Sequence, residues 1–232
     1  AVTRERFQRL LSPAIAQQVI EGKVKVEKGG EVIATEFFPL DVSNFASAIT
    51  RIQAEKPDVV WSVLVGNAHN AFYRQYEATV GKDTIPLASC MFGIGREQTY
   101  LSADESAGIV NATSFHDGLE TEAAKTFLDN FKTYANDDSY VGDYGELGYR
   151  GVKLWALAAE KAGDASADAV IEALPGTSFD APGGKVTIDG QTNHAIMDIH
   201  LIRANREQGW DHLGTTEQLQ PVDTQAVCTL GS

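Results

Sequence analysis

The chain has 232 residues, enough to bury a sizeable core as one large domain or two small ones. Hydrophobic residues make up 43% and charged residues 22%, as in ordinary globular proteins, and no apolar run approaches the ~18 residues of a membrane span. The formal charge of −13 argues against nucleic-acid binding, because phosphate contacts need clustered Lys and Arg.

The first thirty residues differ from the rest in charge. Residues 1–30 are net basic and the remainder is strongly acidic, which indicates a segment boundary. Apolar spacing predicts two short amphipathic helices over residues 4–21. The start lacks the apolar stretch of a secretory signal, so either a signal was removed with other sequence or the chain is not exported by itself.

Residues 31–113 alternate between strand and helix patterns. A continuous β-branched run at 59–65 is typical of a strand buried on both faces of a parallel sheet. Ser43 suits the N-cap of the helix before this run, and Lys56-Pro57 ends that helix. The other predicted strands are residues 32–40, 85–88 and 108–113, and the other predicted helices are 67–78 and 95–101. This βαβαβ order implies a parallel sheet with flanking helices.

The pattern changes after His116. Apolar spacing predicts helices over 120–135, 147–162 and 168–174, with no strand between them on which they can lie. Strands return at 185–188 and 196–203, and the tail after Trp210 is polar and extended. Residues 179–184, with their Pro and paired Gly, indicate a turn.

Three segments resemble the later half of type I periplasmic solute-binding proteins of ABC transporters, in the urea, short-chain amide and branched-chain amino-acid branch. The segments are GGEVIATEFFPLDVSNFASAITRIQAEKPDVV, ELGYRGVKLWALAAEKAG and LPGTSFDAPGGKVTIDGQTNH. In that family each of two lobes is a doubly wound α/β sheet, and the chain crosses between the lobes three times. The last segment favours urea or a short amide as the ligand over leucine.

The resemblance implies how the chain divides. Residues 31–113 and 178–205 should form the second ligand-binding lobe, and the helices in 117–175 should belong to the first lobe. Residues 206–232 follow as a C-terminal tail. Most of the first lobe, including its sheet, should lie upstream of Ala1, so the expected fold is incomplete and its helices should expose an apolar face.

Residues 1–30 depart from this family pattern. The stretch RFQRLLSPAIAQQVIEGKVKVEKGGE is similar to the connector before the catalytic domain of class III nucleotide cyclases. The metal-binding strand that should follow in a cyclase is replaced by VIATE, so no cyclase chemistry is carried over.

Polar residues follow two predicted strands where an open α/β sheet binds its ligands. The predicted ligand residues of this region are Gly66, Asn67, His69, Ser89, Phe92 and Gly93, with Glu97 nearby. A helix that begins at Asn67 offers free N–H groups to a carboxylate or carbonyl oxygen. The alternative interpretation makes Asn67 only an N-cap and His69 a solvated helix residue.

Two further ligand residues are predicted at the start of a later helix. Tyr144 can pack on a ligand while its hydroxyl donates, and Glu146 can accept from an amide or ammonium group. The alternatives are a core position for Tyr144 and a first-turn carboxylate favoured by the helix dipole for Glu146.

Signals of catalysis are weak in this sequence. It has no GxSxG, HExxH, P-loop or CxxC motif, and the five histidines lack metal-ligand spacing, so we expect neither an enzyme nor a cofactor or metal. Cys90 and Cys228 could form one disulfide.

The leading hypothesis is an extracytoplasmic component that captures a small polar solute and delivers it to a membrane permease, with no nucleic-acid partner. The alternative is a cytoplasmic amide-sensing regulatory module with the same fold.

Overall fold

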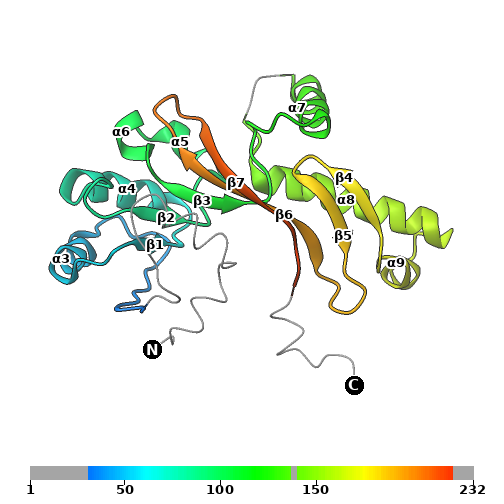
Figure 1. Cartoon of the computed structure of the whole chain (residues 1–232), viewed down its shortest axis with the longest axis horizontal. Coiled ribbons are helices and arrows are strands. Elements are labelled where there is room, and N and C mark those ends of the chain that lie inside the picture. The colour runs from blue at the N-terminus through cyan, green and yellow to red at the C-terminus, as the bar shows by residue number, and fades with distance from the viewer. Residues whose placement is uncertain (1–30, 137–139, 222–232) are drawn as a thin grey trace. The chain divides into compact units, whose positions relative to one another are not determined.

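The computed structural model describes residues 31–136 and 140–221, which form two compact units (Figure 1). Unit 1 contains the described residues up to Thr113 and His200–Gly214, and unit 2 contains Ser114–Ile199 and the segment from Thr215 onward. The helices predicted over 4–21 lie outside the described residues.

Unit 1 contains a parallel sheet, as the sequence predicted. Its strands are β1 (Val60–Ser62), β2 (Leu87–Ser89) and β3 (Val110–Thr113), and each pairs in parallel with the next. The far end of β6 (Ala195–Ala204) pairs antiparallel with β3. β1 is shorter than the predicted 59–65 because pairing with β2 stops at Ser62.

Four helices belong to unit 1: α3 (Ala46–Glu55), α4 (Asn67–Thr79), α5 (Glu97–Tyr100) and α6 (Ala103–Ser106). α3 is confirmed, but the Ser43 N-cap is wrong, because the N-cap is Phe45 and the Asn44 side chain accepts from the Ala46 N–H at 3.0 Å. The strand predicted over 32–40 is also wrong, since this largely exposed segment pairs with no other strand.

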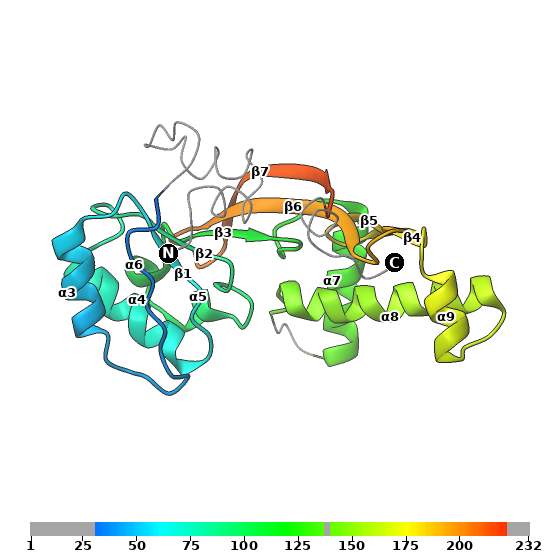
Figure 2. The ribbon, with the colours of Figure 1, turned by 90° about the horizontal axis from the view of Figure 1, so that it is seen from below.

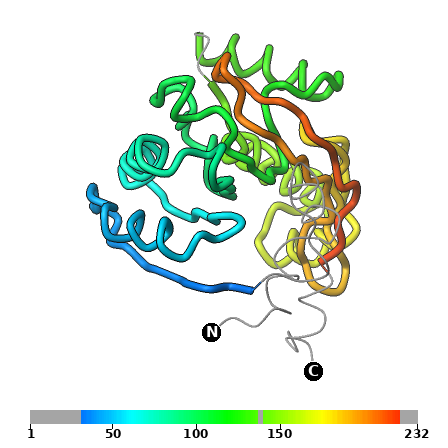
Figure 3. Tube along the Cα trace, turned by 60° about the vertical axis from the view of Figure 1, so that its left-hand side comes forward, coloured from blue at the N-terminus to red at the C-terminus, as the bar shows by residue number. Residues whose placement is uncertain are grey.

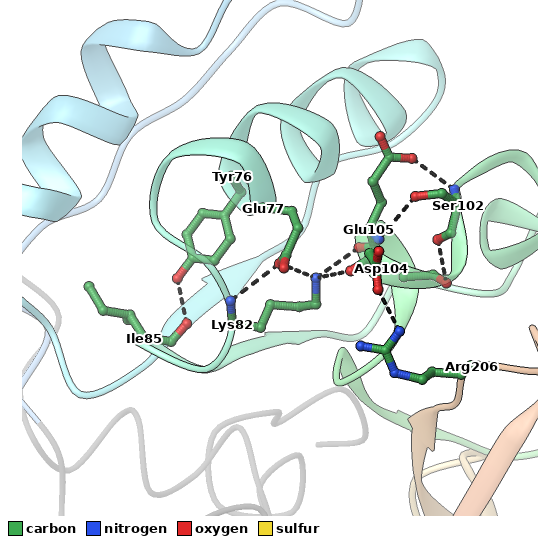
Figure 4. Close-up of polar contacts among 9 residues, drawn as sticks. Tyr76, Glu77, Lys82, Ile85, Ser102, Asp104, Glu105 and Arg206 are labelled. Atoms are coloured by element: carbon green, nitrogen blue, oxygen red, sulfur yellow. Dashed lines mark hydrogen bonds and ion pairs between the residues drawn. The ribbon is translucent and has the colours of Figure 1, made fainter.

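A buried aromatic core and a polar network hold unit 1 together. Tyr76 is fully buried, and its hydroxyl donates to the Ile85 carbonyl at 2.7 Å just before β2. Figure 4 shows the Lys82 ammonium between the Glu77 carboxylate and the backbone carbonyls of Asp104 and Glu105 in α6. These contacts brace the amino ends of the strands, opposite the ends that the predicted site requires.

Unit 2 combines three helices with an antiparallel arrangement of strands. The helices are α7 (Glu122–Ala135), α8 (Asp143–Ala162) and α9 (Ala167–Ala173), and the strands are β4 (Ser178–Ala181), β5 (Gly184–Ile188) and the near part of β6. Figure 2 shows α9 beside the carboxyl end of the long helix α8. The turn predicted within 179–184 lies at Pro182 and Gly183, between β4 and β5, whereas the strand β4 before it was not predicted.

The tail after Trp210 is extended, but it is also a strand, which the sequence did not predict. β7 (Trp210–Leu219) pairs with β6, and Figure 3 traces the two as neighbouring segments.

The helices of unit 2 expose apolar side chains, which confirms that prediction. Large apolar residues with at least a third of their surface exposed include Tyr134, Tyr144, Leu147, Tyr149, Val152, Trp155 and Ile171. Gly148 and Gly151 lie among them on α8 with open space around their Cα atoms. α8 therefore has an exposed apolar side, which contains Tyr144, Leu147 and Trp155.

The observed division of the chain differs from the predicted one. Residues 178–199 group with the helices of unit 2, because β4 packs against α7 and α8. The sequence had placed 178–205 with 31–113. Which lobe each segment joins in a complete binding protein stays a prediction.

Candidate ligand-binding site

Most of the predicted ligand residues lie in unit 1, around the carboxyl ends of β1 and β2. They are Gly66, Asn67, His69, Ser89, Phe92 and Gly93. Gly66, Asn67 and His69 follow β1, and Ser89, Phe92 and Gly93 follow β2. The ring of Tyr73 contacts both sets, with its centroid 5.0 Å from that of His69 and 5.1 Å from that of Phe92. The structure therefore gathers residues from both strand ends into one cluster, and their contact with a ligand stays a prediction.

The amino end of α4 presents uncapped N–H groups. Gly66 is the N-cap at φ +64°, a conformation that favours glycine, and it makes no side-chain capping bond. Asn67 is the exposed first residue of the helix, and the first turn contains no acidic residue. The positive end of the helix dipole therefore faces no carboxylate from α4 itself, which suits an incoming oxygen acceptor.

His69 lies on the first turn of α4 and is 1% exposed, so the alternative interpretation as a solvated residue is wrong. Its Nδ1 lies 3.8 Å from Glu97 Oε1, which is too long for a hydrogen bond but forms an ion pair when the imidazole is protonated. Neither ring nitrogen has a hydrogen-bond partner within the described part of the chain. A buried imidazole without a partner leaves hydrogen-bonding capacity unused.

The Glu97 carboxylate organises the loop that follows β2. Its Oε2 accepts from the Gly93 N–H at 2.8 Å and from the Gly95 N–H at 3.0 Å. Burial opposes the charged form, but His69 and the N–H groups of Glu97 and Gly95 outweigh burial and hold the pKa of Glu97 below its ordinary value. Glu97 is therefore charged at neutral pH and fixes the loop.

A row of small polar residues crosses the sheet beneath this loop. Ser62, Ser89 and Asn111 share one register across the parallel strands, and all three are buried. Burial raises the pKa of the Tyr73 phenol, and the hydroxyls of Ser89 and Ser62 oppose this shift, so the phenol lies against the row. Asn111 Nδ2 donates to the Phe92 carbonyl at 2.5 Å. The row thus connects the sheet to the loop.

Phe92 and Gly93 hold the loop against the core of unit 1. Phe92 is fully buried and meets Trp210 edge-on, with ring centroids 5.9 Å apart. Gly93 has φ +87°, and a Cβ there would lie 2.4 Å from the Trp210 ring. Only glycine fits this close approach, which positions the loop whether or not it contacts a ligand.

The other two predicted ligand residues, Tyr144 and Glu146, belong to unit 2. Tyr144 is 55% exposed at the start of α8, so it is not a core aromatic. Glu146 is fully buried and forms an ion pair with Arg150. Burial raises the pKa of Glu146, and Arg150 opposes the shift. A ligand contact for either residue stays a prediction.

Several residues of the cluster were not predicted. Tyr73 lies on the apolar face of a predicted helix, and Asn111 lies within a predicted strand, so neither stands out as a ligand residue. Trp210 lies more than a hundred positions after Gly93, so the local sequence gives no sign of their contact. The pairing of His69 with Glu97 likewise depends on tertiary structure.

The described ranges contain no group of three or more His, Cys, Asp or Glu residues that could hold a metal ion. No helix in those ranges is long and apolar enough to cross a membrane. Cys90 is a free cysteine there, and Cys228 lies outside the described residues.

Similar solved structures are solute-binding proteins. One from Rhodopseudomonas palustris BisB5, in complex with 3,4-dihydroxybenzoic acid, has 22% identity and a TM-score of 0.69 over 80% of this chain and 52% of its own. An amino acid ABC transporter substrate-binding protein from Pseudomonas fluorescens Pf-5 has 17% identity and a TM-score of 0.71 over 83% of this chain and 53% of its own. A branched-chain amino acid ABC transporter periplasmic ligand-binding protein from Burkholderia xenovorans LB400 has 19% identity and a TM-score of 0.65 over 78% of this chain and 50% of its own.

These similarities show the type I periplasmic-binding-protein fold, and the chain spans about half the length of the proteins it matches. The sequence also matches the family described as periplasmic binding protein domain over residues 12–227. The match begins inside the segment that resembles a cyclase connector, and that resemblance is not confirmed. Because the match covers nearly the whole sequence, the chain belongs to the periplasmic binding protein domain family.

Proposed function

We propose that this chain is part of the substrate-binding component of an ABC transporter, which captures a small polar solute outside the cytoplasm and delivers it to a membrane permease. The observation that carries the proposal is the uncapped amino end of α4 beside the buried His69 imidazole. The arrangement supplies hydrogen-bond donors to a solute, and the proposed role requires binding without a chemical step.

The ligand class follows from the donors at this site. Uncapped N–H groups and an imidazole suit a carboxylate or an amide carbonyl. Urea, short-chain amides and branched-chain amino acids all present such an oxygen. The similar solute-binding protein from Rhodopseudomonas palustris BisB5 is in complex with an aromatic carboxylic acid, 3,4-dihydroxybenzoic acid. We therefore place the ligand's carboxylate or carbonyl oxygen at Asn67 and His69 in unit 1, with Ser89 and the Phe92-Gly93 loop nearby.

A pair of substitutions at Asn67 tests this placement. Asn67→Pro removes one N–H while keeping the helix start, because proline is favoured at the first helical position. Asn67→Ala keeps that N–H and removes only the side chain. Backbone amide resonances of residues 66–69 are followed by NMR during titration with acetamide, urea, leucine and 4-hydroxybenzoate.

We expect one of these solutes to shift those resonances in the wild type and in Asn67→Ala, and to bind at least about tenfold more weakly to Asn67→Pro, which corresponds to ~1.4 kcal/mol. Equal binding to the two variants would show that the ligand oxygen does not bind at the amino end of α4. Binding of none of the solutes would sink the proposed ligand class. The regulatory alternative is not proposed, because its basis in sequence lies within residues 1–30, outside the described ranges.

A further inference from the structure

Arg150 and Glu146 form an ion pair inside unit 2, one turn apart on α8. Glu146 is fully buried and Arg150 is 4% exposed. Arg150 Nε donates to Glu146 Oε1 at 3.2 Å, and Nη2 donates to the other carboxylate oxygen. Removing two charges from water can offset most of what their attraction returns, so such a pair is weak evidence of net stabilisation. Its retention in a core points to a positional role.

The other contacts of Arg150 reach beyond α8. Nη2 donates to Ser114 Oγ at 3.2 Å, and Nη1 donates to Met197 Sδ at 2.9 Å. The Ser114 hydroxyl in turn donates to Asp143 Oδ1 at 2.6 Å, at the first residue of α8. One guanidinium thus ties α8 to two other segments through donors on three nitrogens that are held in one plane.

Those two segments adjoin two of the three places where the chain passes between the units, and the third is Gly214–Thr215 in β7. Ser114 is the first residue of unit 2 after β3, and Met197 lies just before the chain leaves unit 2 at Ile199. The turn between β4 and β5 packs against the first of these segments, at Ser114. A Cβ on Gly183 would lie 1.9 Å from the Ser114 carbonyl oxygen, so the backbones of these two residues are in tight contact.

We propose that the Arg150 cluster, defined as Arg150, Glu146, Ser114 and Met197, fixes the two crossing segments 113–116 and 197–199 to α8. The cluster therefore holds the backbone of unit 2 beside two of its boundaries with unit 1. In this role Arg150 and Glu146 are positioning residues and need not touch a ligand. The inference therefore stands or falls separately from the proposed transport function.

Hydrogen exchange measured by mass spectrometry on the full chain tests the proposal. Arg150→Met leaves the Glu146 carboxylate buried without its partner, so it should destabilise the whole unit. The informative variant is the double substitution Glu146→Leu with Arg150→Met, which removes both charges and restores an apolar core. Val170→Ala serves as the control, because it opens a cavity between α8 and α9 away from the cluster.

In the double variant we expect amides in 113–116 and 197–199 to exchange at least about tenfold faster than in the wild type, while amides in α8 and α9 keep their wild-type protection. In Val170→Ala the faster exchange should instead be confined to α8 and α9. Wild-type protection of the crossing segments in the double variant would overturn the proposal. An even rise across unit 2 would also overturn it, since that would show a purely stabilising role.

Discussion

Replacing Glu97 with glutamine tests whether the loop after β2 is held by charge. The carboxylate accepts the N–H groups of Gly93, at 2.8 Å, and Gly95, at 3.0 Å, and only 15% of its side chain is exposed. A hydrogen bond to a charged group contributes about 1.5–3 kcal/mol, and glutamine keeps one acceptor oxygen without the charge. We therefore expect Glu97→Gln to lower the free energy of unfolding by ~2 kcal/mol.

The assay is urea unfolding followed by tryptophan fluorescence, in which Trp210 reports directly on the loop because it contacts Phe92 and Gly93. For a chain of this size ~2 kcal/mol corresponds to a fall in Tm of about 4–8 °C. Glu36→Gln is the matched control, since Glu36 pairs with Arg51 at 3.3 Å on the surface and should matter by less than ~0.5 kcal/mol.

The contribution of Glu97 to the free energy of unfolding should also depend on pH. The pKa of Glu97 is lowered from 4.5 in the folded chain, so the stabilisation is fully present above about pH 4.5 and is lost as the pH falls through the lower folded-state value. Wild-type stability should therefore fall more steeply below pH 4.5 than that of Glu97→Gln. A variant no less stable than Glu36→Gln, or two parallel pH profiles, would refute the assigned role of the carboxylate.

Two further pairs of substitutions, each a test with its control, concern unit 2. Gly183→Ala should lower the free energy of unfolding in urea by at least ~2 kcal/mol, because the new Cβ would clash with the Ser114 backbone. Gly148→Ala has open space around it and should stabilise α8 by up to about 1 kcal/mol. Equal effects would contradict the close contact at Gly183. The exposed apolar side chains of α8 predict that the chain self-associates. Trp155→Gln should weaken that association in sedimentation velocity by about fivefold, because the indole is 49% exposed on α8, whereas Tyr100→Gln in unit 1 should leave it unchanged. An unchanged association in both variants would show that this side of α8 does not associate.

Helices were predicted more closely than strands, for a physical reason. The helix predicted over 67–78 is α4 at Asn67–Thr79, because a helix satisfies its hydrogen bonds locally and its apolar spacing is visible in the sequence. A strand exists only where a partner pairs with it. The run at 59–65 is therefore cut to β1, the similar pattern at 32–40 forms no strand, and polar β7 is a strand because β6 lies beside it.

The candidate site was predictable only in part. The strand-end rule selected His69 and Gly93 from local sequence, since carboxyl ends of parallel strands share one edge of a sheet. It could not select Trp210 or the contact with Glu97, which depend on tertiary structure. Burial of the Glu146–Arg150 ion pair could not be predicted either. Their spacing is that of an ordinary surface ion pair on a helix, and only the structure shows that both are buried.

Polar atoms buried without a hydrogen-bond partner give an independent argument for the site in unit 1. Within the described ranges they include both ring nitrogens of His69, Gln98 Oε1 and Asn111 Oδ1. Each such atom costs about 1–3 kcal/mol, which a marginally stable fold does not retain without cause. His69 adjoins the uncapped end of α4, and Asn111 holds the Phe92 carbonyl of the loop that Glu97 fixes. A solute or bound water that reaches this cluster would satisfy these groups, and each new hydrogen bond would offset part of that cost.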